Sequence, residues 1–368
     1  MIPFSSRLSR YLAIQMLAGL ALSFGVIVTI ILLVDFVEQT RAIGTRVDIP
    51  ATDLFMLTLM RAPLLIEQTL PFIFLFGILT ALFRLNRRSE LIVMRASGYS
   101  AWRIVAPAVW MSLIGGLLGA MALNPIGSAL NARYEAQEAA LTRSGNSNRV
   151  ESNPIWLREL TEDGYVIIAA ADVDGDAGSV TRPRFLYYRQ VDGGRPVFDR
   201  RIDADRAVLR GGFWGLENAI ESTPGQEAEA MDALSLPTAI ERQALFERSR
   251  SPRTIAFWDL PGVILAAREA GLTTHRFELR WQTLLALPLT LIAVSLLAAA
   301  ATLRLYRLGG AASFALAGGA AGFLVYFVQE LLASFGSSAA LPPITAAWAA
   351  PTITALLALA YLASTEDG

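Results

Sequence analysis

Six long apolar runs constrain this chain more than any other feature of its sequence. A helix needs about 20 mainly apolar residues to cross the hydrocarbon core of a bilayer. Inside lipid a spanning segment must pair all of its backbone polar groups, and runs of this length favour the helix. We therefore predict an α-helical integral membrane protein with six transmembrane helices. The runs are Leu12–Val34, Leu54–Phe83, Ile104–Leu123, Leu284–Leu303, Leu308–Leu332 and Ile344–Ala363.

The composition favours the same class of protein. Hydrophobic residues make up 54% of the chain and charged residues only 17%, whereas a soluble domain has roughly 25% charged residues. The first run is longer than the apolar region of a signal peptide, and no cleavage site follows it before Asp35, so we interpret it as an anchor. The net charge of −1 gives no reason to expect a nucleic-acid partner.

Arginines in the short loops predict the orientation. If six spans alternate in direction, nine arginines fall on one face of the membrane, whereas the short loops on the opposite face carry only Arg41 and Arg46. Because basic residues collect on the cytoplasmic side, both termini are expected in the cytoplasm, and the long segment after the third run is expected in the periplasm of a bacterium. This predicts a multi-pass protein of the inner membrane. The cytoplasmic arginines are Arg7, Arg10, Arg84, Arg87, Arg88, Arg95, Arg103, Arg304 and Arg307.

The long outer segment has a different pattern, with short β-type runs separated by Gly, Asp and Pro. This spacing predicts a small inserted all-β domain, a sandwich or jelly roll. Asp259–Glu269 is expected to form a short helix, with Pro261 in its first turn and Gly271 just past its end. The expected strands are Ile155–Leu157, Tyr165–Ala169, Phe185–Tyr188, Ala207–Leu209 and Phe213–Leu216. The predicted domains are 1–130 with the first three transmembrane helices and a cytoplasmic helix at 87–98, 131–275 with the β domain, and 276–368 with the last three transmembrane helices.

Several absences from the sequence argue against an enzyme. The chain contains no lysine, so it lacks the Lys of a phosphate-binding loop, and any ATP must be bound by a partner. It has no cysteine and a single histidine, His275, which we interpret as an ordinary surface or interface residue because metal sites usually need several converging ligands. No nucleophile–base set occurs in the apolar runs. We expect no catalytic residue, metal or cofactor.

The loop between the second and third runs carries a short amphipathic helix pattern. Ser89 is the expected N-cap and Gly98 the expected C-terminal stop. One interpretation is a helix that lies on lipid headgroups and is held there by arginines. The other is a coupling helix that docks into a groove of a cytoplasmic ATPase, and Glu90 favours it because an acid gains nothing from anionic headgroups. The candidate coupling residues are Arg87, Arg88, Ser89, Glu90, Leu91, Met94, Arg95, Ser97 and Gly98.

The string from Ser89 to Gly98 resembles the SEL-x-x-M-x-ASG signature of the LptF/LptG (YjgP/YjgQ) permeases, the membrane subunits of the ABC-type lipopolysaccharide exporter. The similarity extends over nearly the whole chain, although the outer strands match only as a pattern. Of the two paralogues, the chain looks more like LptG. Further matching segments are Asp35–Gln39, Pro71, the segment from Arg276 to Pro288 that leads into the fourth run, and Leu341-Pro342-Pro343 before the sixth run.

The resemblance implies a specific assembly. Such a permease pairs with an LptF-like paralogue to enclose a cavity, binds two copies of the ATPase LptB through its coupling helices, and lies beside the single helix of LptC. Lipopolysaccharide enters from the outer leaflet of the inner membrane and passes to a periplasmic bridge of jelly-roll domains. The chain would then transport without an ATPase site of its own.

A band of charged residues is expected near the outer membrane face. We interpret Arg276 and Glu330 as interfacial residues and Glu67 as a paired structural acid between helices. The planar guanidinium group of arginine presents a rigid fork of N–H donors that matches phosphate oxygens. The resemblance implies that Arg41 and Arg133 hold the phosphates of lipid A. The family often has a basic residue where this chain has Asp35, and Arg61 is the expected local replacement.

The apolar wall of the cavity is expected from the first and fifth runs, because each buried CH₂ of an acyl chain contributes about 0.8 kcal/mol. Ordinary lipid-facing packing is the alternative for each of these side chains. Gly318, Gly319 and Gly322 are interpreted as helix-packing positions. The candidate wall residues are Phe24, Ile27, Ile31, Phe323, Tyr326 and Phe327.

Two other functions remain open on the sequence. The chain could be the paralogous LptF subunit. It could also be a mechanotransmission protein that passes ATPase motion to periplasmic partners without transporting a substrate, although such proteins typically have four spans and this sequence has six runs.

Overall fold

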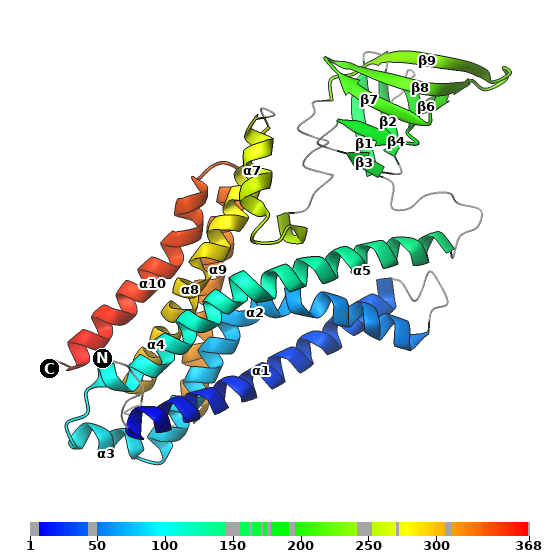
Figure 1. Cartoon of the computed structure of the whole chain (residues 1–368). Helices are drawn as coiled ribbons and strands as arrows, with labels where there is room; N and C mark the ends of the chain where they lie inside the picture. Colours follow the sequence, from blue (N-terminus) through cyan, green and yellow to red (C-terminus); the bar gives the residue numbers. More distant parts are fainter. Residues whose placement is uncertain are drawn as a thin grey trace.

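The computed structural model describes residues 7–42, 50–144, 155–161, 164–170, 172–174, 178–190, 196–240, 252–269, 272–305 and 311–366. Within them the chain has two parts, a long helical bundle and an antiparallel sheet that lies beyond one end of it (Figure 1). We name the two ends of the bundle the sheet end and the α3 end, after the short helix α3 (Glu90–Ala96) at the opposite end from the sheet.

Six helices in the described residues are long and apolar enough to cross a membrane, which confirms the predicted number. Among the described residues, their shared core consists mainly of leucine, isoleucine, alanine and phenylalanine side chains, which come from every one of these helices except the fifth. The helices are α1 (Arg7–Ala42), α2 (Ala51–Arg87), α4 (Ala101–Leu118) with its continuation, α8 (His275–Leu305), α9 (Ala311–Ser337) and α10 (Pro343–Glu366).

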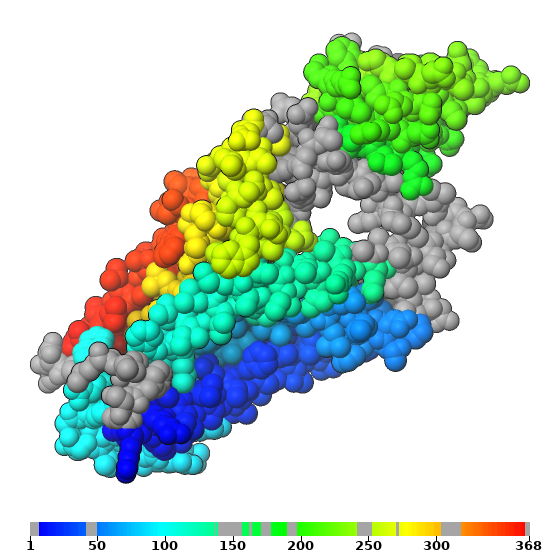
Figure 2. Space-filling view, viewed as in Figure 1, coloured from blue at the N-terminus to red at the C-terminus, as the bar shows by residue number. Residues whose placement is uncertain are grey.

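The third span does not end where its apolar run ends. After α4 comes a π turn, η1 (Gly119–Leu123), and then α5 (Asn124–Ser144), so that one helical rod continues toward the sheet. Within the predicted segment 131–275, helix continues to Ser144 and the first strand begins at Ile155. In the space-filling view α1, α2 and α5 form one continuous surface between α3 and the sheet end (Figure 2).

Helix α3 is shorter than the segment 87–98 that the sequence predicts. Arg87 still belongs to α2. Ser89 occupies the N-cap position of α3 as predicted, but its φ of 59° is left-handed and its side chain makes no cap hydrogen bond. The C-terminal stop is correct. Gly98 has a φ of +84°, and N–H groups of Gly98 and Tyr99 donate to the carbonyls of Arg95 and Met94, each at 3.0 Å. These two bonds form the Schellman arrangement that ends a helix at glycine.

The inserted domain is a curled sheet of nine antiparallel strands in the order β1-β2-β5-β6-β8-β7-β4-β3, with β9 added on β8. Strand β8 (Phe213–Ser222) pairs with β7 along its first half, with β6 along its end and with β9 on its other edge. The other strands are β1 (Ile155–Thr161), β2 (Gly164–Ala170), β3 (Asp172–Asp174), β4 (Ser179–Thr181), β5 (Arg184–Gln190), β6 (Pro196–Asp203), β7 (Arg206–Arg210) and β9 (Glu229–Pro237).

The chain returns to the bundle through a 3₁₀ turn, η2 (Pro252–Thr254), and helix α7 (Leu260–Glu269), which confirms the predicted short helix. This return segment is attached to the π turn. The indole of Trp258 donates to the carbonyl of Met121 at 3.1 Å, and the side-chain oxygen of Asn124 accepts from the N–H of Phe257 at 2.8 Å. A π turn leaves backbone groups without regular helical partners, and the return segment supplies such partners here.

Candidate functional site

The face of α3 that points away from the bundle is apolar at its centre. Leu91 and Met94 are buried in the helical core, as their spacing predicts. Ile92 and Val93, which no sequence pattern singled out, are 45% and 66% exposed. Arg87 and Arg88, which precede this pair in the chain, and Arg95, which follows it, are exposed as well. An exposed apolar pair with exposed arginines before and after it in the chain is suited to dock a partner protein.

Two side-chain hydrogen bonds attach the α3 segment to the start of α1. The hydroxyl of Tyr11 donates to Glu90 Oε2 at 2.7 Å, and the hydroxyls of Ser9 and Tyr99 lie 3.0 Å apart. Arg88 lies 3.9 Å from Glu90 in an exposed ion pair. Glu90 is therefore held within the chain. Tyr11 was not among the predicted residues, because nothing in the spacing of the sequence connects it to Glu90.

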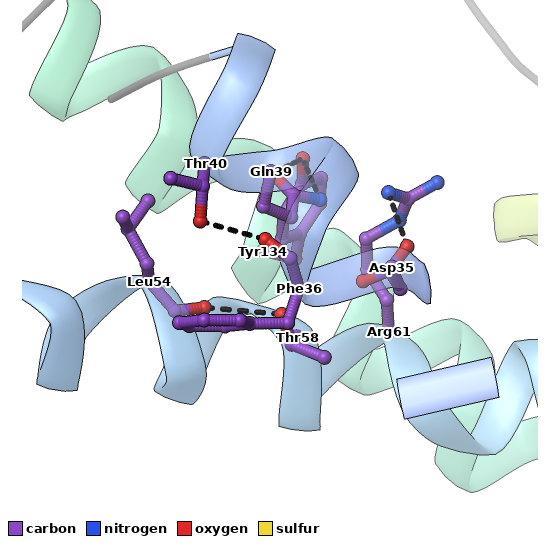
Figure 3. A network of polar contacts seen from close by, with 8 residues as sticks. All are labelled: Asp35, Phe36, Gln39, Thr40, Leu54, Thr58, Arg61 and Tyr134. Carbon is purple, nitrogen blue, oxygen red and sulfur yellow. Dashed lines mark hydrogen bonds and ion pairs between the residues drawn. The ribbon is translucent and has the colours of Figure 1, made fainter. Parts of the chain in front are cut away.

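A polar network joins α1, α2 and α5 toward the sheet end (Figure 3). Arg61 Nη1 lies 2.9 Å from Asp35 Oδ1, and the guanidinium of Arg61 also stacks 5.1 Å from the centroid of the Tyr134 ring. The Gln39 amide and the Tyr134 hydroxyl exchange two hydrogen bonds of 2.9 and 3.1 Å. Asp35, Gln39 and Tyr134 are buried. Arg61, the expected local replacement for a basic residue at position 35, thus contacts Asp35 itself.

A second network lies deeper in the bundle and ties four segments together. Glu67 of α2 is 4% exposed, and its carboxylate pairs with Arg280 of α8 at 2.7 Å and accepts from the amide of Asn124 at 2.8 Å. Asn124 in turn holds Phe257 of the return segment. This agrees with the interpretation of Glu67 as a paired structural acid, since polar side chains between membrane helices commonly hold them together.

The two predicted phosphate-binding arginines lie on the bundle's sheet end. Arg41 is exposed in the last turn of α1, and Arg133 is exposed on α5, one residue before Tyr134 of the network. Arg276 and Glu330, interpreted as interfacial, are also exposed. The arrangement gives cations on α1, α2 and α5 around the same end of the bundle, although Arg61 already has an acidic partner.

The predicted apolar wall lies on the two least buried spans, α1 and α9, which both pack against α2. Phe24, Phe323, Tyr326 and Phe327 are exposed, while Ile27 and Ile31 are half-buried on α1. The ring of Tyr326 lies 5.1 Å from that of Phe72 on α2. Gly318 and Gly322 are buried against Leu79 and Leu75 of α2, as helix-packing glycines should be.

A pocket of about 310 Å³ lies at the sheet end between α7, α8 and the start of α10. Its walls are mostly apolar, and the Arg268–Glu278 ion pair of 2.7 Å lies at its edge. No sequence signal indicated it, because its lining comes from segments far apart in the chain. No group of three or more potential metal ligands occurs in the described residues.

Comparison with known proteins agrees with this architecture. The model of the family "Lipopolysaccharide export system permease LptF/LptG" matches residues 10–364. The lipopolysaccharide export system permease protein LptG of Haemophilus influenzae is 26% identical over 330 residues, covering 88% of this chain and 89% of that protein. LptG of Escherichia coli K12 is 23% identical over 348 residues, covering 92% and 93%. A family match across all six spans and the inserted sheet means that the chain belongs to the lipopolysaccharide export permease family LptF/LptG.

Proposed function

We propose that this permease is the LptG-type subunit of an ABC-type exporter and that α3 receives force from a separate ATPase. The observation that carries the proposal is the surface of α3, where the exposed Ile92–Val93 pair has exposed arginines before and after it in the chain, at the opposite end of the bundle from the sheet. A helix resting on lipid would bury such residues in the headgroup region, where the acid Glu90 gains nothing from anionic headgroups. The relatives named LptG support the choice of paralogue.

The proposal includes the partners. A dimer of the ATPase LptB binds below α3, an LptF-like paralogue completes the cavity, and the helix of LptC lies beside α1. The short-loop arginines support an orientation with both termini in the cytoplasm and the sheet in the periplasm. The absence of lysine supports an external ATPase, because a phosphate-binding loop cannot be built without it.

The substrate path follows from the exposed spans. Lipopolysaccharide enters from the outer leaflet, with its acyl chains against the apolar faces of α1 and α9 and its phosphates at Arg41, Arg133 and Arg61. A wall of this kind replaces the lipid environment, so that the acyl chains leave the bilayer without exposing each CH₂ to water. Cavity closure then moves the substrate toward the sheet and the periplasmic bridge.

Replacing Glu90 with alanine should weaken the docking surface on α3. We expect the amount of LptB that co-purifies with the complex to fall by about tenfold, as for a central interface residue, with a matching loss of lipopolysaccharide release from proteoliposomes. Asp53→Ala, an exposed acid at the sheet end, is the matched control and should leave both unchanged. Normal LptB recovery and normal export in the Glu90→Ala variant would contradict the assignment of α3.

Site-specific photocrosslinking separates a transporter from a mechanotransmission protein. A photoreactive residue at Ile27 or Ile31 on α1 should crosslink to lipopolysaccharide in cells, and the yield should depend on ATP. Leu357 on α10 is exposed but lies outside the proposed wall, so it serves as the matched control. Equal crosslinking at all three positions, or none at α1, would exclude the proposed path.

A further inference from the structure

We propose that Tyr11 is a positioning residue that fastens α3 to α1, and that α1 tilts about its contact with α2 when α3 is displaced. The proposal rests on the proposed function in one respect, that a partner ATPase displaces α3. It adds the route by which that displacement reaches the wall of the cavity. Helix α1 thereby becomes the moving part that connects the two ends of the bundle.

The first step is the attachment of α3. Its two ends are held to α1 by the Tyr11–Glu90 bond of 2.7 Å and by the Ser9–Tyr99 contact of 3.0 Å. Between these points Leu91 and Met94 are buried in the core that also contains Leu12 and Met16 of α1. A bond from a phenol to a carboxylate is a charge-assisted hydrogen bond, stronger than a neutral one. Any displacement of α3 is therefore passed to the first turns of α1.

The second step is the crossing of α1 and α2. A methyl group on Gly19 would overlap the carbonyl oxygen of Gly77, and one on Gly77 would lie 2.8 Å from the Cα of Leu20. The two backbones therefore touch at this point, as they do where glycines meet between membrane helices. Because packed backbones deform little, this contact is the natural centre of rotation for α1.

The third step is the unequal length of the two parts of α1 on either side of Gly19, which we call its short arm, toward Tyr11, and its long arm, toward Asp35. At 1.5 Å per residue, Tyr11 lies about 12 Å from Gly19 along the helix axis, and Asp35 lies about 24 Å from it on the other side. A tilt moves Asp35 about twice as far as Tyr11. Most of the large apolar side chains in the long arm are exposed, and α1 packs against α2 along its length, with the Asp35–Arg61 pair at the far end of this arm. A small displacement of α3 thus acts on the polar network at the sheet end.

Spin labels provide a direct test, because this chain contains no cysteine and contributes no background to engineered pairs. One pair, at Ile14 on α1 and Ala96 on α3, reports the attachment and leaves the Ile92–Val93 docking pair unchanged. A second pair, at Leu33 on α1 and Ile344 on α10, reports the tilt. All four positions are exposed. In the complete complex, Tyr11→Phe should broaden the distance distribution of the first pair and abolish the ATP-analogue-induced shift of the second. Tyr165→Phe in the sheet is the matched control.

The same variants also test the coupling between ATP hydrolysis and lipopolysaccharide release. In proteoliposomes the Tyr11→Phe complex should release about tenfold less lipopolysaccharide per ATP hydrolysed, which is the loss expected for one hydrogen bond to a charged group, while LptB recovery stays normal. Glu90→Gln, which keeps an acceptor for Tyr11, should retain the narrow distance distribution of the first pair. Unchanged distances and coupling in Tyr11→Phe overturn the proposal. Failure of the native chain to bind LptB overturns the proposed function instead, and the first label pair still tests the attachment without the ATPase.

Discussion

Replacing Glu67 with leucine should destabilise the helical bundle severely. The substitution leaves the Arg280 guanidinium without its partner at 2.7 Å and the buried amide of Asn124 without its acceptor. Removing one member of a buried ion pair costs about 3–5 kcal/mol, because the remaining charge stays desolvated. We expect little folded protein after extraction in detergent, measured by fluorescence-detected size-exclusion chromatography.

The adjacent residue supplies the control. Gln68 is exposed, so Gln68→Ala should leave the elution profile and the thermal midpoint unchanged. The double variant Glu67→Leu/Arg280→Leu removes both charges and should recover a large part of the lost folded protein. If Glu67→Leu behaved like Gln68→Ala, the network of α2, α5 and α8 would not hold the bundle together.

Replacing Arg61 with methionine is expected to have the second largest effect. Asp35 is 5% exposed and pairs with Arg61 at 2.9 Å, while its second carboxylate oxygen has no hydrogen-bond partner among the described residues. Loss of Arg61 leaves this carboxylate buried and unpaired, and also removes the cation above the Tyr134 ring. We expect a loss of about 3 kcal/mol, measured as a lowered thermal midpoint.

A double-mutant cycle assigns that loss to the pair. Asp35→Asn combined with Arg61→Met should be more stable than Arg61→Met alone, with a coupling energy of about 1–3 kcal/mol. In the Asp35→Asn single variant Arg61 keeps its charge but loses its competitor for phosphate, so lipopolysaccharide should be retained longer by the detergent-purified complex. Additive effects in the cycle would show that the two side chains act independently.

The spans were predictable because lipid enforces a simple rule on composition. Each run from Leu12 onward lies within one helix or overlaps it, since an apolar stretch of this length has no other way to pair its backbone in a membrane. The ends were not predictable. Helices α1, α2 and α8 continue into polar sequence at the sheet end, where packing against neighbouring helices, and not apolar content, maintains them.

The sheet was predictable only where its strands are apolar. Strand β2 shows a buried Val-Ile-Ala pattern and was found, whereas β9 buries only Leu236 and was missed. Strand β6 carries the charged segment Asp199–Asp203 with Ile202 as its buried residue, and it too was missed. Both strands exist because β8 and β5 offer them backbone partners. Such pairing is a tertiary effect that local patterns do not contain.

The residues of the candidate site also fall into those that the sequence could predict and those that it could not. Glu67 and Arg61 were selectable because ionisable residues inside apolar runs are costly and rarely lack a role. Asp35 was selected too, but the pairing of Glu67 with Arg280 and of Arg61 with Asp35 depends on how the helices cross. Tyr134, Gln39 and Tyr11 give no such signal, because a lone tyrosine or glutamine beside a span has many ordinary uses.

The length of the helices at the sheet end has a final consequence. Helix α1 has 36 residues and α2 has 37, which correspond to about 54 Å each, against a hydrocarbon thickness of about 30 Å. If Arg10 marks one surface, about three turns of each helix stand beyond the other surface, and the exposed side chains of Val34, Val37, Phe55 and Met56 make that projection apolar. An amphiphile drawn out of the leaflet would therefore meet an apolar protein surface beyond the bilayer before it reaches open water.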